Sequence, residues 1–251
     1  MARNPALRQD DLMSSPAGAE RAMSWIDRRR FRYKRQRTVL LDDVRRDLKT
    51  GDIILFHKTA RTGILDTLEL DFVAPLFFPT NEFRHSGIVV RRGEALFVVE
   101  CTEEFHSGHS HARYPVGGKG IREVALEPLL EAYTSDNGDP HFGVRFIRNE
   151  IDADVLMSTV REIGPVSYLK ASRSIPIYLS SFFLPASVHS RIIERHSTEM
   201  MCSEFVHRAL AGCGALREYP SKIFAPYIIE NSLLFARHDL AGYSDIVRFV
   251  V

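Results

Sequence analysis

The stretch TEMMCSEFVHRALAG contains a cysteine, Cys202, whose position suits nucleophilic chemistry. Apolar residues follow it at helical spacing and predict an amphipathic helix that begins near the cysteine: Phe205, Val206, Ala209 and Leu210. In the first turn of a helix, unpaired N–H groups and the helix dipole lower a cysteine pKa from about 8.5 to roughly 3.5–7.5. Cys202 is therefore either a nucleophile or a small buried residue, since free cysteines commonly pack in cores.

A cysteine nucleophile needs a base, and the base needs an orienting acceptor. Of the ten histidines, His85 stands out because HSGIVV and ALFVVECT predict two strands joined through RRGE. A two-residue turn, at Arg92-Gly93 or Gly93-Glu94, places Glu100 opposite position 85 or 87 and on the same face as His85. A three-residue loop would separate them. The alternative is a strand-end histidine satisfied by solvent beside an unrelated glutamate.

Other residues could do chemistry, but their surroundings favour it less. His57 ends a predicted strand and competes with His85 as the base, although no equally well-placed carboxylate follows it. Cys101 must point away from Glu100, and Cys213 follows a predicted helix end, so we expect both to be structural. Three histidines of EFHSGHSHARY could make an open zinc site, but their spacing matches no strong metal signature: His106, His109 and His111. We therefore expect a solvent-exposed loop there, with no metal and no cofactor.

The helices and strands that must position these residues are predicted from the spacing of apolar residues and from the turn and capping residues between them. TGDIILFH reads as a turn, with Asp52 as its structural residue, followed by a buried strand. Further strands are predicted at 121–126, 142–148 and 245–251, and helices at 39–48, 152–163, 187–195 and 202–212. Asp152 and Gly164 should bound the second helix, whereas Ser197 or Thr198 should cap the last and Gly212 should end it. Strands first and helices later predict an α+β domain.

Composition fits a globular chain that is not a nucleic-acid protein. The 251 residues are 45% hydrophobic and carry a net charge of +1, and the longest apolar run is broken by proline. We expect no transmembrane segment and, because the N-terminus lacks an apolar signal region, a cytoplasmic location. Three widely spaced cysteines predict no disulfide framework.

The first fifty residues concentrate positive charge. They hold 13 Lys or Arg against 7 Asp or Glu, and seven of the ten residues of RRRFRYKRQR, 28–37, are basic. Such a segment either contacts an anionic membrane, which would make the protein peripherally bound, or is a solvated basic arm.

Four quoted pieces together resemble a known family: TGDIILFH, HSGIVV, Glu100 at the end of the next strand, and CSEFVHRAL. They resemble the circularly permuted papain-like cysteine amidases, the YiiX-like branch of the NlpC clan, over about 45–251. The resemblance implies the catalytic order His85, Glu100, Cys202. A family element upstream of the cysteine is matched by GPVSY, which makes Tyr168 a candidate substrate or oxyanion contact.

The sequence thus predicts a basic extension over 1–38 and a catalytic domain over 39–251 with a His-rich insertion at about 104–120. The expected fold is α+β, permuted papain-like, with an antiparallel sheet or small barrel packed against helices that include the Cys202 helix. The expected activity is that of a cysteine hydrolase, an amidase or peptidase or an acyl-lipid hydrolase or acyltransferase. Its substrate would be a peptide, an acyl-lipid or a small amide. The alternative is a catalytically idle module of the same fold that binds a lipid or peptide.

Overall fold

The computed structural model describes a folded unit that lies within Thr38–Val251. The described residues are 38–57, 83–102, 113–115, 120–137, 141–169, 188, 198–218, 229–230 and 235–251. The expected extension over 1–38, apart from its last residue, and most of the His-rich insertion and of the helix expected at 187–195 lie outside these ranges.

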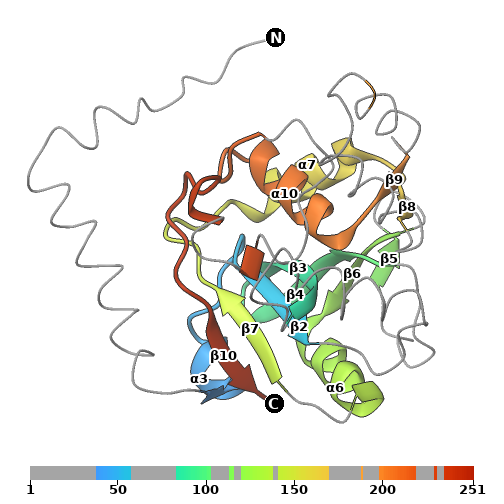
Figure 1. Ribbon diagram of the computed structural model, residues 1–251. Helices are drawn as coiled ribbons and strands as arrows, with labels where there is room; N and C mark the ends of the chain where they lie inside the picture. The colour runs from blue at the N-terminus through green and yellow to red at the C-terminus, as the bar shows by residue number, and fades with distance from the viewer. Residues whose placement is uncertain are drawn as a thin grey trace, which may run out of the picture. The chain divides into compact units, whose positions relative to one another are not determined.

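A mainly antiparallel sheet forms the centre of this unit (Figure 1). Its strands follow the spatial order β1-β10-β7-β2-β3-β4-β6-β5, and only the pairing of β1 with β10 is parallel. Their bounds are Val39–Leu40 (β1), Ile53–His57 (β2), Phe83–Arg92 (β3), Ala95–Cys101 (β4), Arg113–Pro115 (β5), Ile121–Ala125 (β6), His141–Arg145 (β7) and Val247–Val250 (β10). A mixed α/β architecture with an antiparallel sheet is thereby confirmed.

The β3–β4 hairpin turns through two residues. Arg92 pairs with Ala95, so Gly93 and Glu94 form the turn, and Gly93 has a φ of 61°. A positive φ suits the tight turns that match strand twist. The resulting register places Glu100 directly opposite Gly87 and diagonal to His85. This is one of the two predicted registers, and it puts Glu100 and His85 on one face of the sheet.

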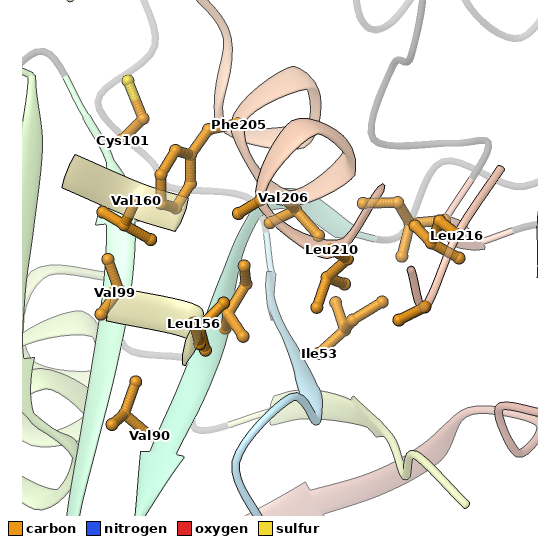
Figure 2. Close-up of a cluster of buried hydrophobic side chains, with 14 of the residues drawn as sticks. Ile53, Val90, Val99, Cys101, Leu156, Val160, Phe205, Val206, Leu210 and Leu216 are labelled. Atoms are coloured by element: carbon orange, nitrogen blue, oxygen red, sulfur yellow. The ribbon is translucent and has the colours of Figure 1, made fainter. Parts of the chain in front are cut away.

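Two helices cover the sheet and enclose the main core. The helices α7, Ala153–Ile163, and α10, Cys202–Gly212, pack against each other and against β3 (Figure 1). The core between these helices and the sheet contains the predicted apolar stripe of α10. Figure 2 shows representative residues of this core: Ile53, Val90, Val99, Cys101, Leu156, Val160, Phe205, Val206, Leu210 and Leu216. Burial of this stripe is what holds α10, and with it Cys202, in place.

The predicted bounds of α7 are confirmed. Asp152 is the N-cap, and its carboxylate accepts hydrogen bonds from the backbone N–H groups of Asp154 and Val155 at 2.9 and 3.1 Å. Gly164, with a φ of 77°, ends the helix. Both signals are local in sequence, which explains why they could be recognised.

The predicted bounds of the last helix, 202–212, are those of α10, but its predicted cap residues are wrong. The N-cap is Met201, which makes no side-chain capping hydrogen bond, and Thr198 lies just before β9, Glu199–Met200, which pairs with β8, Ser167–Tyr168. At the other end Gly212 is still helical, and the left-handed residue is Gly214 with a φ of 74°. Gly212 is required for packing instead, since a Cβ there would lie 2.5 Å from Thr159 Cγ2 of α7.

Two further helices differ from prediction. The helix expected at 39–48 is only α3, Leu41–Arg45; Leu40 lies in β1 with a 60% exposed side chain, although Val44 and Leu48 are buried. The helix α6, Leu126–Asn137, packs on β4 and β6 and was not predicted. No described helix is long and apolar enough to cross a membrane.

Candidate active site

His85 and Glu100 form the first contact of the candidate site. His85 Nε2 lies 2.7 Å from Glu100 Oε2, and the Glu100 side chain is fully buried while that of His85 is 12% exposed. The facing residue, Gly87, leaves this face of β3 open: a Cβ there would lie 2.5 Å from Val98 Cγ1 and 3.4 Å from the Cβ of Glu100. The hairpin register and this glycine therefore let a buried carboxylate reach the imidazole.

Arg122 forms an ion pair with the other carboxylate oxygen of Glu100. It lies directly across from Glu100 on β6, and its Nε donates to Glu100 Oε1 at 2.6 Å while Nη2 contacts the same oxygen. Burial by itself would raise the pKa of Glu100, but the charges of His85 and Arg122 and their hydrogen bonds lower it to about 2. Glu100 therefore stays ionised although it is out of contact with water.

Cys202, the first residue of α10, follows Glu100 and His85 as the third member of a row of interacting side chains. Burial opposes ionisation of its thiol, but attraction to His85, a hydrogen bond with His85 and hydrogen bonding from Ser86 lower the pKa of Cys202. Burial likewise opposes protonation of His85, but the Cys202 and Glu100 charges and hydrogen bonds raise its pKa to about 10. Both shifts favour a thiolate beside an imidazolium, and the N–H groups at the start of α10 favour the thiolate further.

Aromatic rings hold the imidazole of His85. The Tyr133 ring, from α6, stacks on it at 6.0 Å between centroids and 16° between planes, and the Phe56 ring lies 5.3 Å away at 46°. Phe56 and Tyr133 also contact each other at 4.5 Å. Since both rings are buried, they fix the plane of the imidazole and exclude water from its faces.

Tyr168 also reaches the thiol. Tyr168 of β8 is paired in register with Met200 of β9, two residues before Cys202. Burial, the nearby Cys202 charge and a hydrogen bond with Cys202 raise the pKa of Tyr168 well above its ordinary value. The Tyr168 hydroxyl therefore stays protonated and can donate a hydrogen bond at this position.

The competing residues lie in other surroundings. His57 ends β2 with its ring 6.4 Å from Phe83. Cys101 is in the core, where its Sγ contacts Met200 O at 3.6 Å and burial raises its pKa, and Cys213 Sγ lies 3.6 Å from Thr159 Oγ1. Asp52 is buried and accepts hydrogen bonds from the backbone N–H groups of Lys49 and Ile147 at 2.7 and 2.6 Å, which confirms a structural role.

The candidate metal ligands of the sequence belong to the His-rich insertion. His106, His109 and His111 lie outside the described residues. Within the described ranges, no group of three or more His, Cys, Asp or Glu side chains is arranged to hold a metal ion.

The structure thus brings together His85, Glu100, Cys202 and Tyr168, and adds residues that sequence reasoning missed. These residues are Arg122, Phe56 and Tyr133, and the two aromatic residues carry no sequence signal of their own. An arginine inside the strand IREVA was the available clue, because a buried strand position seldom holds a charge that lacks a partner. Recognising its partner required the pairing of β4 with β6.

Fold and site together define a mixed α/β protein with a buried cysteine–histidine–glutamate row. No family model matches the chain. It is 33% identical, over 221 residues, to uncharacterized protein R372 of Acanthamoeba polyphaga mimivirus, with 83% of this chain and 84% of the viral protein covered. The chain belongs to the same family as this viral protein.

Proposed function

We propose that the protein is a cysteine hydrolase that cleaves an amide or ester bond through an acyl-enzyme. The observation that carries this proposal is the continuous row from Glu100 to His85 to Cys202, with a contact of 2.7 Å between the carboxylate and the ring and a hydrogen bond between the ring and the thiol. Because Nε2 is occupied by Glu100, Nδ1 is the ring nitrogen available to Cys202. A nucleophile, a base and an orienting acceptor in this order are what nucleophilic catalysis requires.

In the proposed first half-reaction, the Cys202 thiolate attacks the carbonyl carbon of the substrate. The electron pair of the C=O bond moves to the oxygen, where the backbone N–H of Cys202 and the Tyr168 hydroxyl can donate hydrogen bonds. As the tetrahedral species collapses, the bond to the leaving nitrogen or oxygen breaks, and imidazolium His85 supplies the proton. The product is a thioester on Cys202 and a free amine or alcohol.

In the second half-reaction His85 acts as a base. Neutral imidazole takes a proton from water, the hydroxide attacks the thioester, and the acid leaves while Cys202 returns to the thiolate. The restored imidazolium is stabilised by Glu100, whose buried carboxylate does not itself need to gain a proton. An acceptor other than water would convert the same chemistry into acyl transfer.

We further propose that the fold is a circularly permuted papain-like one, of the YiiX-like branch of the NlpC clan. The order along the chain supports this, since the base and its carboxylate on β3 and β4 precede the nucleophile on α10. In ordinary papain-like chains the cysteine comes first. An antiparallel sheet against the nucleophile helix is consistent with the proposal.

The alternative is a catalytically idle lipid- or peptide-binding module. In such a module the buried charges would cost free energy of folding without serving a reaction. A buried carboxylate and imidazolium cost several kcal/mol unless they are paired, and perturbed pKa values gather at catalytic sites. Iodoacetamide labelling at neutral pH separates the two. We expect Cys202 to react much faster than half-buried Cys213, and Cys202→Ala to remove both this reaction and hydrolysis while the protein still melts cooperatively.

The matched control for this experiment is Cys213→Ala, which removes a thiol that contacts Thr159 of α7, outside the candidate site, and should leave fast labelling intact. Equal slow labelling of Cys202 and Cys213 in the parent protein would contradict the proposed hydrolase and favour the binding module. Mass analysis of the adduct trapped on Cys202 after exposure to cell extract would then identify the acyl group.

A further inference from the structure

Two arginines are almost fully buried, and they are used differently. Arg145 of β7 and Arg122 of β6 are both 2% exposed. Arg145 donates to the backbone carbonyls of Ile229, Ser244 and Glu230 at 2.6, 2.8 and 3.0 Å, which ties separate chain segments to the sheet. Arg122 instead directs Nε and Nη2 at a single oxygen of Glu100. Arg145 is thus a fold-stabilising residue, whereas the contact of Arg122 leads into the candidate site.

An arginine at this position is not needed to fill space. A buried ion pair is often no more stabilising than apolar residues of the same volume, because desolvation offsets the attraction between the charges. Val124, the next residue on the same face of β6, is apolar and buried, so an apolar residue at 122 would suit this face of the strand. Fold stability alone therefore does not explain why an arginine stands at position 122.

We propose that Arg122 is a positioning residue that acts through Glu100 to set the protonation of the catalytic pair, an inference that rests on the proposed hydrolase function. The guanidinium of Arg122 holds Oε1 of Glu100 in place, so that Oε2 of Glu100 points at His85 Nε2 at a distance of 2.7 Å. Its charge also keeps Glu100 ionised without access to water. Arg122 itself does not reach the thiol or the substrate in this scheme.

Several titratable groups surround this carboxylate, and two of them, His85 and Arg122, have the largest effects on its charge. The groups contributed by the elements packed around Glu100 are His85 of β3, Arg122 of β6, Tyr133 of α6, Tyr168 of β8, Cys202 and Glu204 of α10, and Cys101, its neighbour on β4. The principal charge effects on Glu100 come from His85 and Arg122. Removal of Arg122 therefore leaves Glu100 with one cationic neighbour in a fully buried position.

The consequence is a specific change in pH dependence. An opposite charge within about 4–6 Å lowers a carboxyl pKa by roughly 1–3 units, so Arg122→Met should raise the pKa of Glu100 by that amount. Below the raised pKa Glu100 is neutral, imidazolium His85 loses its counter-charge, and the Cys202 thiolate becomes less stable. Above it the behaviour of the parent protein should return. A purely structural role would lower reactivity at every pH.

The test measures iodoacetamide alkylation of Cys202 against pH in the full chain, with thermal melting alongside. We expect Arg122→Met to move the acid limb to higher pH by no more than Glu100→Gln does, and Arg122→Lys, which keeps the charge, to lie nearer the parent. The control is Arg92→Gln, which removes a half-exposed ion pair with Glu123, the neighbour of Arg122 on β6. This control should leave the profile unchanged.

A double-variant comparison keeps the test decisive if Arg122→Met alone folds poorly. Glu100→Gln with Arg122→Met contains neither buried charge, and its acid limb should lie no higher in pH than that of Glu100→Gln, because the carboxylate through which Arg122 acts is already gone and the amide is free to turn its oxygen to His85. A further shift to higher pH in the double variant, or an unshifted profile in folded Arg122→Met, would overturn the proposed role. An unreactive Cys202 in the parent would instead refute the hydrolase proposal itself.

Discussion

Replacement of Glu100 by glutamine tests the proposed row at its centre. The carboxylate accepts from two donors, Arg122 Nε at 2.6 Å and His85 Nε2 at 2.7 Å. Glutamine has nearly the same shape but a single acceptor oxygen. If that oxygen accepts from Arg122, the amide NH₂ faces His85 and favours the neutral ring. The substitution therefore removes the charge and also sets one donor against another.

The expected magnitude follows from these contacts. Loss of an opposite charge at hydrogen-bond distance changes a pKa by about 1–3 units, equivalent to roughly 1.4–4 kcal/mol. Burial already acts to lower the pKa of His85, and in the parent the Cys202 and Glu100 charges outweigh it and raise that pKa to about 10. Imidazolium is present below that pH and lost above it. In Glu100→Gln the alkaline limb of hydrolysis should therefore fall by about 1–3 pH units.

The acid limb should move in the opposite direction, because a less stable imidazolium raises the pKa of the Cys202 thiol. Iodoacetamide alkylation against pH measures the acid limb, and hydrolysis of a small ester measures the alkaline limb. Glu123→Gln is the matched control, since Glu123 is a nearly buried glutamate on the adjacent strand whose ion pair is with Arg92. Superimposable profiles for the parent and Glu100→Gln would refute the reasoning.

Three further predictions concern the base, the arm and the fold. His85→Ala should lower turnover by about 10²–10⁴ and by more than Glu100→Gln does, whereas His57→Ala should be mild; the reverse order would show that the wrong histidine was chosen. Deletion of 1–37 should leave cleavage of a soluble ester intact but reduce co-sedimentation with anionic liposomes at low salt, and equal sedimentation would exclude the arm as a membrane contact. Asp52→Ala should destabilise the fold by roughly 1–3 kcal/mol in denaturant titration, because it leaves the backbone N–H groups of Lys49 and Ile147 without their acceptor, and an unchanged midpoint would contradict that role.

The parts of the fold that the sequence predicted correctly depend on short-range signals. The β3–β4 register follows from the length of one turn at Gly93, and the ends of α7 follow from Asp152 and Gly164. The apolar stripe of α10 was likewise readable because period 3.6 is a local pattern. These elements contain His85, Glu100 and Cys202, and so the three residues of the proposed triad could be selected.

The errors lie where distant segments meet. The N-cap of α10 was misplaced because the residues after Thr198 form β9, which pairs with β8, some thirty residues earlier, and no local signal at Thr198 shows this. Arg122 was missed for the same reason, since its relation to Glu100 depends on the pairing of β4 with β6. The true role of Gly212 is to admit Thr159 of α7, and helix–helix approach leaves no mark on either sequence alone.

The spacing of the three triad residues along the chain has a kinetic consequence. His85 and Glu100 are 15 residues apart on one hairpin, whereas Cys202 joins them only when α10 packs on β3 and β4. Hairpins close within microseconds, but contacts between distant segments form later because of loop-closure entropy. We therefore expect Cys202 in the nascent or refolding chain to have the low reactivity of an ordinary thiol until α10 packs on the hairpin. The onset of fast alkylation would then mark the time at which α10 docks, so the labelling rate of Cys202 reports the last stage of folding.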